Sequence, residues 1–383
     1  MKDPSMNQRE RFFAVLDGQP FNKTPYFPDI TNWYDARRVP RGAPQKYSCG
    51  AFIPDDDPYH NDRGDMPEEY TDWTFLDFYR NFGWGLPVHL YEWYSTEYEG
   101  RVELVSTVED SRKISVLHTP EGSLTKISLL AEDGSWAPHE HFVKTIEDLD
   151  IIEYAVARAQ YTPLPEKSRR FYAAAGDFGV CDIPINRSPF GKLVHEYMGF
   201  QQTVFALMDH RDRILDFLAF QEEHDLTVIR MAAEYPADTV IISDHADENL
   251  ISPPQYEEYC IPFYQKACGI LHDKGKFVST HLDGNFKGFF PVIHETGFDF
   301  LDGCTPAPMF NYEVEELAEA LGDTMYAYCG VPATLFTQHL DTAKITDFGT
   351  RIINAFDGKV ILNIGDILPQ NADIEQAVEL GKM

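Results

Sequence analysis

From residue 238 onward, short apolar runs alternate with helical stretches, and this alternation constrains the fold more than any other feature of the chain. Strand–helix–strand alternation at this spacing predicts parallel strands joined by crossover helices. Earlier strands are predicted over residues 26–30 and 171–179. No GxGxxG motif follows a strand, which disfavours an open dinucleotide-binding sheet. The pattern therefore predicts an α/β fold, a single (β/α)8 TIM barrel. The five late runs are DTVIISD, GKFVSTHLD, FDFLDGC, MYAYCGV and KVILNIGD.

Polar or reactive side chains stand where these predicted strands end. His281 and Asp283 are two residues apart, so they project to the same side of an extended segment. In a barrel the carboxyl ends of the strands surround one mouth, where enzymes of this architecture place their reactive groups. We therefore expect a ring of functional groups drawn from different strands. The other strand-end residues are Asp244, His245, Cys304, Cys329 and Asp366.

The first third of the chain has a different organisation. Residues 7–17 form a predicted helix, capped near Ser5 or Asn7, and residues 40–70 are rich in Pro, Gly and Asp. Residues 101–145 alternate in hydropathy and contain the turn sequences PEGS and EDGS, which are hairpin signals. We predict one domain over residues 1–383, with a surface excursion and a β-hairpin-containing insertion at about 40–150.

Composition and charge exclude several classes of partner. The net charge of −30 disfavours nucleic acids and anionic membrane surfaces as partners. The six cysteines are scattered, which is typical of a reduced cytoplasmic protein. The amino terminus lacks the apolar segment of a signal peptide, and no apolar stretch is long enough to span a membrane. A small-molecule substrate is the expected partner.

Several motifs, in order along the chain, resemble the uroporphyrinogen decarboxylase superfamily. The opening RERFFAVLDGQPFNKTPYF, the middle block RSPFGKLVHEYMGF and the segment ISDHADENLISPPQYEEYCIPFYQKA are similar to its characteristic segments. The closing KVILNIGDILPQNADIEQAVEL is similar to its last strand and helix. The resemblance implies a single (β/α)8 barrel, in agreement with the strand–helix alternation.

The superfamily contains cofactor-free decarboxylases and zinc-dependent methyltransferases that work with corrinoid proteins. The decarboxylases carry Gly-His in the last strand turn, where this chain has Gly365-Asp366. They also carry an arginine-rich segment after the first strand. The corresponding segment here holds Arg37, Arg38 and Arg41, which a solvated basic turn explains equally well.

The thiol-methylating members bind zinc through His-x-Cys and a cysteine after the final glycine. The resemblance places His281, Asp283 and Asp366 at these positions, so both thiolates are replaced by carboxylates. Zinc accepts such ligands, and oxygen ligands make a harder, more electrophilic site. A site of that kind suits an oxygen leaving group, as in O-demethylation of an ether. Cys329 is a further candidate ligand, with a buried small hydrophobe as the alternative.

Further candidates for catalysis are Tyr197, which matches a decarboxylase tyrosine, and the cluster of Asp244, His245 and Glu248. These acidic residues could equally cap the helix that begins near Pro253. Six aromatic residues of the first third could line a pocket for an aromatic substrate, although core packing is the common role of such side chains. They are Trp33, Tyr34, Trp84, Tyr91, Trp93 and Tyr94.

The sequence therefore predicts a zinc-dependent methyltransferase that moves a methyl group from a small methylated substrate to a corrinoid carried by a partner protein. An aromatic ether is one substrate of this kind. Two alternatives stay open: a cofactor-free decarboxylase of the uroporphyrinogen decarboxylase type, and a non-catalytic barrel that binds a small molecule or a corrinoid partner.

Overall fold

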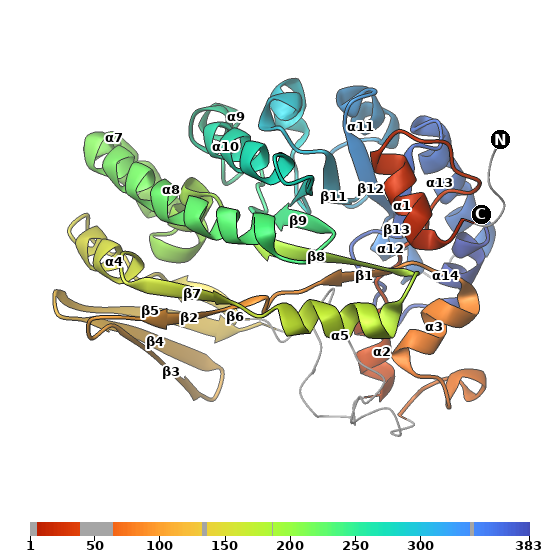
Figure 1. Cartoon of the computed structure of the whole chain (residues 1–383), viewed down its shortest axis with the longest axis horizontal. Coiled ribbons are helices and arrows are strands. Elements are labelled where there is room, and N and C mark those ends of the chain that lie inside the picture. Colours follow the sequence, from red (N-terminus) through yellow and green to blue (C-terminus); the bar gives the residue numbers. More distant parts are fainter. Residues whose placement is uncertain (1–5, 39–63, 132–135, 186, 338–340) are drawn as a thin grey trace.

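A curved sheet of seven parallel strands forms the centre of the molecule in the computed structural model, which describes residues 6–38, 64–131, 136–185, 187–337 and 341–383 (Figure 1). Its strand order is β1-β8-β9-β10-β11-β12-β13, and all of its pairings are parallel. The strands are β1 (Leu86–His89), β8 (Gly179–Ile185), β9 (Thr239–Ile242), β10 (Phe277–His281), β11 (Phe300–Cys304), β12 (Tyr326–Val331) and β13 (Val360–Ile364).

Helices connect successive strands and cover the outer face of the sheet (Figure 1). The helices that precede β9 are α1 (Gln8–Leu16), α2 (Thr31–Arg38), α3 (Phe75–Phe82), α4 (Asp148–Val156), α5 (Pro165–Ala175), α6 (Pro189–Lys192), α7 (Phe200–Asp209) and α8 (Arg211–Glu234). Those that follow are α9 (Pro253–Gln255), α10 (Ile261–His272), α11 (Val314–Leu321), α12 (Ala333–Phe336), α13 (Thr342–Ala355) and α14 (Ile374–Gly381). Short 3-10 segments are η1 (Glu68–Tyr70) and η4 (Lys287–Thr296), and π-helical turns are η2 (Leu193–Tyr197) and η3 (Tyr256–Cys260). Among the described residues, no helix combines the length and the hydropathy needed to cross a membrane.

The two edges of the sheet are joined by a short segment rather than by the expected first strand. Tyr26 forms a single parallel bridge with Leu362 of β13, and the Gly85 N–H, just before β1, donates to the Tyr26 carbonyl at 2.9 Å. The prediction of a strand over 26–30 was therefore too long. Pro25 and Pro28 flank the bridge and lack the N–H groups that a longer ladder needs. Of the predicted (β/α)8 TIM barrel, a TIM-like α/β fold is confirmed, with seven parallel strands in the main sheet of the described residues and a single bridge at Tyr26 between its edges.

A second prediction, a strand over 171–179, is wrong for most of its length. Helix α5 extends to Ala175, and β8 begins only at Gly179. Pro165 occupies the first turn of α5, where its missing N–H has no cost, and alanine is the strongest helix former. Gly176, with φ of 60°, ends the helix.

The insertion consists of antiparallel strands, as its hairpin signals indicated. Between β1 and α5 the chain forms a two-stranded ribbon of β2 (Tyr94–Tyr98) and β7 (Ala159–Pro163). A four-stranded sheet of β3 (Glu103–Glu109), β4 (Arg112–Thr119), β5 (Gly122–Leu130) and β6 (Trp136–Glu140) lies within it. The PEGS turn joins β4 to β5, whereas the EDGS turn lies outside the described residues. Both β1 and α3 precede this unit, so the region 40–150 also contributes to the main sheet.

The interior of the sheet changes from apolar to polar along the strands. Phe12 of α1 packs with Val180, Phe300 and Ile361 near the amino ends of β8, β11 and β13. Since side chains alternate along a strand, the next inward position on β11 is Asp302. The apolar layer closes the amino-terminal end of the barrel, and polar groups gather toward the carboxyl ends, as they do in barrel enzymes.

Candidate active site

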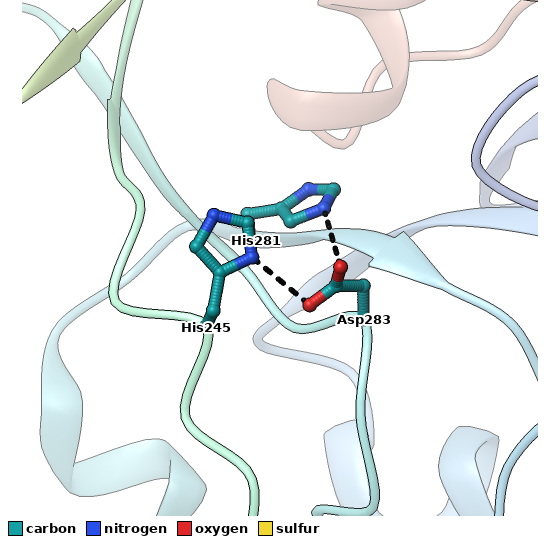
Figure 2. Close-up of side chains that lie close together, drawn as sticks. All are labelled: His245, His281 and Asp283. Atoms are coloured by element: carbon teal, nitrogen blue, oxygen red, sulfur yellow. Dashed lines mark hydrogen bonds and ion pairs between the residues drawn. The ribbon is translucent and has the colours of Figure 1, made fainter. Parts of the chain in front are cut away.

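His281 and Asp283 come together at the carboxyl end of β10, as predicted (Figure 2). The His281 Nε2 lies 3.7 Å from Asp283 Oδ2. The other carboxylate oxygen, Oδ1, lies 3.0 Å from Nδ1 of His245, which follows β9. Each oxygen of Asp283 therefore faces a different histidine. The three side chains form a group whose ligating atoms all lie within 4.8 Å of one another.

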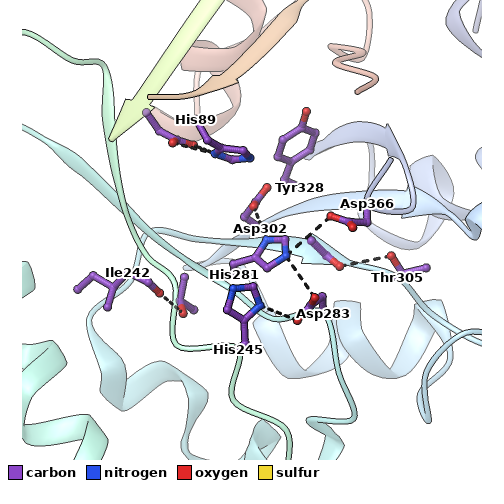
Figure 3. Close-up of polar contacts among 12 residues, drawn as sticks. His89, Ile242, His245, His281, Asp283, Asp302, Thr305, Tyr328 and Asp366 are labelled. Atoms are coloured by element: carbon purple, nitrogen blue, oxygen red, sulfur yellow. Dashed lines mark hydrogen bonds and ion pairs between the residues drawn. The ribbon is translucent and has the colours of Figure 1, made fainter. Parts of the chain in front are cut away.

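Asp302 fixes the orientation of His281 from the neighbouring strand. The two residues are paired in register between β10 and β11, and the His281 Nδ1 lies 2.8 Å from Asp302 Oδ2 (Figure 3). The Asp302 side chain is only 6% exposed, and that of His281 is 13% exposed. When a neutral histidine donates its Nδ1–H to a carboxylate, its Nε2 carries the lone pair that can bind a metal or a proton. The Nε2 of His281 faces the mouth of the barrel.

Asp366 approaches the same nitrogen from the other side. Its Oδ1 lies 3.8 Å from His281 Nε2, and its side chain is 36% exposed (Figure 3). Asp366 has a φ of 67° and His245 a φ of 47°, values that are uncommon for residues other than glycine. Such conformations cluster at functional sites, where the surrounding structure imposes them.

The donor set fits a divalent metal ion. Two atoms that each lie about 2.1 Å from one zinc ion are at most about 4.2 Å apart. The distances from His281 Nε2 to Asp283 and Asp366 fall within this limit. The contact of Asp302 with Nδ1 is the arrangement that metal-binding histidines have in their second coordination shell. His245, His281 and Asp283 could therefore hold a metal, and Asp366 approaches the same nitrogen of His281 as a fourth group.

Proton affinities in this cluster reflect burial and the opposite charges of its members. Burial lowers the pKa of His281, but its hydrogen bonds with Asp283 and Asp302 outweigh this, and the pKa is raised well above its ordinary value. Burial raises the pKa of Asp283, but its hydrogen bonds with His245 and His281 reverse the effect and lower it. For Asp366 burial dominates and raises the pKa. The carboxylate of Asp283 is therefore the more firmly ionised of the two.

The structure adds a second His–Asp pair that the sequence analysis missed. His89, the last residue of β1, contacts Asp182 of β8 through Nδ1, at 2.8 and 2.7 Å from the two carboxylate oxygens. Burial lowers the pKa of His89, but the charge and hydrogen bond of Asp182 prevail and raise it to about 9. Figure 3 shows His89 near Tyr328 and Asp302, beside the predicted site.

Replacement of His89 by glutamine is expected to remove a pH-dependent contribution to stability. A histidine with a folded-state pKa of about 9 and an ordinary pKa of about 6.5 stabilises the fold fully below pH 6.5. This contribution is lost as the pH rises through 9. The wild type should therefore have a higher free energy of unfolding than the variant at pH 6.5. As the pH rises to 9 and above, this difference should shrink by up to about 3 kcal/mol.

Urea denaturation at several pH values measures this difference. The exposed His118 of β4, which contacts Ser123, provides the matched control, His118→Gln. A margin that stays constant across the pH range for His89→Gln would show that His89 is not held as an imidazolium.

Two residues predicted to be catalytic hold the surrounding loops together. The fully buried Asp244 accepts from the Ser188 N–H at 2.7 Å through Oδ1 and from the Tyr264 hydroxyl through Oδ2. Glu248 accepts from the Gly288 N–H and from the Asn311 side chain. Neither of the two belongs to the group formed by His245, His281 and Asp283.

Cys329 also lies outside the His281 group, and Tyr197 packs against a second hydrophobic cluster that includes Phe217. Tyr197 ends the π-helical turn η2 and packs edge-on against Phe217, and burial raises its pKa well above the ordinary value. Cys329 follows the inward-facing Tyr328, so it faces the helices, inside the main hydrophobic cluster. Burial raises the pKa of its thiol to about 12.

The aromatic residues of the first third divide between core and surface. Trp33, Tyr34, Trp84 and Trp93 are buried in the main hydrophobic cluster, whereas Tyr91 is 55% exposed. Four of the six residues considered for an aromatic pocket therefore serve packing.

The missed pair had only a weak signal in the sequence. His89 ends the four-residue run LPVH, which lies in a region read as an excursion, and Asp182 sits in the middle of GVCDIPI. A polar residue inside an apolar run was the available clue, because a buried charge requires a partner. Asp302 gave the same clue within FLDGC.

Comparison with known proteins supports the fold and identifies the family. Among solved structures, a methyltransferase from Methanosarcina mazei is similar over 98% of this chain and 97% of that chain, with 14% identity and a TM-score of 0.58. At that identity the likeness shows the fold alone. A fructuronate-tagaturonate epimerase from Cohnella laeviribosi is 10% identical over 69% of this chain and 72% of that chain. Its TM-score of 0.23 is too low to indicate a shared fold. The comparison with curated proteins finds no match.

The family model described as uroporphyrinogen decarboxylase (URO-D) matches residues 188–380. This range contains strands β9 to β13 together with His245, His281, Asp283 and Asp366. Since the match covers just over half of the chain, the protein belongs to the uroporphyrinogen decarboxylase (URO-D) family.

Proposed function

We propose that this protein is a zinc-dependent methyltransferase, which moves a methyl group from the oxygen of a small methylated substrate, such as an aromatic ether, to a corrinoid protein. The observation that carries the proposal is the environment of His281 Nε2. Asp302 contacts Nδ1 of the ring, and the carboxylates of Asp283 and Asp366 lie 3.7 and 3.8 Å from its Nε2. The structural likeness to a methyltransferase agrees with this proposal.

Three residues would hold the zinc: His281 through Nε2, Asp283 through Oδ2 and Asp366 through Oδ1. His245 contacts the other carboxylate oxygen of Asp283, so we assign His245 to the second coordination shell of the metal. When bound, zinc supplies a Lewis acid that takes up negative charge on the departing oxygen. The imidazole of His245, 39% exposed, is positioned to hold a proton near that oxygen.

Charge favours a cation at this site over an anionic substrate. Asp283, Asp302 and Asp366 contact His245 and His281, and the pair of His89 and Asp182 interacts electrostatically with Asp302 and His281. A metal-free decarboxylase would have to bind a carboxylated substrate against these carboxylates.

Of the arginines considered for a decarboxylase, Arg38 is buried and donates to the backbone carbonyls of Tyr70, Thr71 and Trp73. Arg37 lies over the ring of Trp33, and Arg41 is outside the described residues. Decarboxylation, the activity in the family's name, is therefore the second candidate.

Asp302→Asn is expected to weaken zinc binding by about 10- to 100-fold while the fold is kept. Asparagine still accepts from Nδ1–H, but it no longer raises the basicity of the imidazole. Competition with a chromophoric chelator measures the affinity. Asp299→Asn is the matched control, because Asp299 contacts the exposed His272 and accepts from the Val278 N–H, and an asparagine oxygen can keep both contacts. Equal affinities for the two variants would contradict a ligand role for His281.

Methyl transfer itself can be tested with reduced cobalamin as a stand-in for the partner's corrinoid. The zinc-loaded protein is incubated with cob(I)alamin and a panel of deuteromethyl aromatic ethers. Labelled methylcobalamin and the free phenol should form in equal amounts. Release of carbon dioxide from a carboxylated porphyrinogen by metal-free protein, without methyl transfer from any ether, would favour decarboxylation instead.

A further inference from the structure

A separate cavity of about 260 Å³ lies between the insertion and helix α8. The ribbon β2–β7, strands β3 and β4, and helix α4 contribute to its walls, and α8 contributes part of its floor. None of His281, Asp283 and Asp366 lines it. Tyr98 and Leu104, which are 40% and 50% exposed, mark its opening to solvent.

The floor of the cavity is polar and contains two acceptors without a partner. Lys192 forms an ion pair with Asp225 Oδ1, and Gln221 Nε2 donates to the same oxygen at 2.8 Å. Within the described parts of the chain, Asp225 Oδ2 and Gln221 Oε1 are buried and accept no hydrogen bond. Gln221 is only 2% exposed and Asp225 only 4%. A buried acceptor without a donor is unfavourable, so a molecule that brings donors would bind well here.

The walls are aromatic and apolar. Tyr94 and Tyr161 pack edge-on with ring centroids 5.6 Å apart, and Phe142, Tyr98 and Tyr197 complete the aromatic part of the lining. Aromatic walls with a few polar groups at one end are the usual form of a small-molecule site. An apolar cavity of about 150 Å³ accommodates benzene, so this larger one has room for one ring with short substituents.

The charged groups at the floor of the cavity determine which charge a bound ligand can carry. Lys192 is neutralised by Asp225, and Glu196, which also lines the cavity, adds a negative charge that Arg187 partly balances at 3.7 Å. Because both unpartnered atoms at the floor are acceptors, carboxylates and phosphates are disfavoured as ligands. Donors on a neutral or cationic molecule are favoured.

We propose that this cavity is a second ligand site, which binds a small monocyclic aromatic molecule carrying a hydrogen-bond donor, such as an aromatic amine or a phenol. The site is independent of the proposed methyl transfer, because none of its residues belongs to the His281 cluster. The sequence pointed to Tyr197 as a functional residue, and the second site gives it a role as part of the wall.

Calorimetric titration of the full chain tests the proposal with tyramine, phenol and benzoate as probes. Tyramine or phenol should bind saturably below about 1 mM, and benzoate should not. Gln221→Leu should weaken binding by about five- to tenfold, because it removes one acceptor and keeps the volume. The exposed Gln202 of α7 provides the control, Gln202→Leu. A smaller or absent effect of Gln221→Leu relative to this control would overturn the floor assignment.

Two further variants separate this site from the active site. Leu104→Trp fills the opening at an exposed position, where misfolding is not expected, and should abolish binding. His281→Ala should leave binding unchanged, so a failure of the proposed function would not affect this result. Failure of every donor probe to bind at 1 mM, or binding lost in His281→Ala but kept in Leu104→Trp, would refute the second site.

Discussion

Replacement of His281 by alanine is expected to lower methyl transfer by at least about 10³-fold and to reduce bound zinc to less than a tenth of an equivalent per chain. His281 Nε2 is the atom that both Asp283 and Asp366 approach, so its loss removes the centre of the ligand set. Charge stabilisation by a bound metal amounts to several kcal/mol, and about 1.4 kcal/mol corresponds to a tenfold change in rate. Zinc content is measured by mass spectrometry and turnover by formation of methylcobalamin.

The matched control for this substitution is His118→Ala on the insertion, where the histidine is exposed and distant in sequence from the strand ends. It should retain full zinc content and activity. Wild-type activity in His281→Ala, with the fold intact by circular dichroism, would contradict the assignment of His281 as a ligand.

Replacement of Asp244 by alanine is expected to lower the free energy of unfolding by about 3–5 kcal/mol. The carboxylate is fully buried and accepts hydrogen bonds from the Ser188 N–H and the Tyr264 hydroxyl. Hydrogen bonds to charged groups contribute about 1.5–3 kcal/mol each, and their removal leaves two buried donors without a partner. The protein that remains folded should still bind zinc, because Asp244 positions the loop after β9 rather than a ligand atom.

Urea denaturation measures the loss of stability, with Asp347→Ala at an exposed position of α13 as the control. A variant of wild-type stability that has lost all activity would instead support the catalytic role predicted from sequence.

The sequence was most informative where local pattern and tertiary position coincide. The five late strands have alternation, polar ends and short connections, so their order and their shared mouth followed from general rules. His281 and Asp283 were found in this way because their spacing of two residues is a local property. Asp366 was found in the same way as a strand-end residue, the family resemblance added its role as a ligand, and the structure brings it to 3.8 Å from His281.

The remaining features depend on contacts that have no local signature. The partnership of His281 with Asp302 arises from the register between two strands, and that of His89 with Asp182 joins residues on β1 and β8. Helix α5 and the short bridge at Tyr26 were misread because apolar residues near turns fit both a helix end and a strand. The cavity beside α8 required the packing of the insertion against the barrel, which no periodicity reveals.

Anomalous diffraction at the zinc edge, from a crystal of the zinc-loaded protein, tests the central claim most directly. The proposed site predicts one strong peak per chain, about 2.0–2.2 Å from His281 Nε2 and from carboxylate oxygens of Asp283 and Asp366. No peak at the barrel mouth, or a peak bound elsewhere while His281 remains paired only with aspartates, would contradict the metal site and the methyl transfer that depends on it.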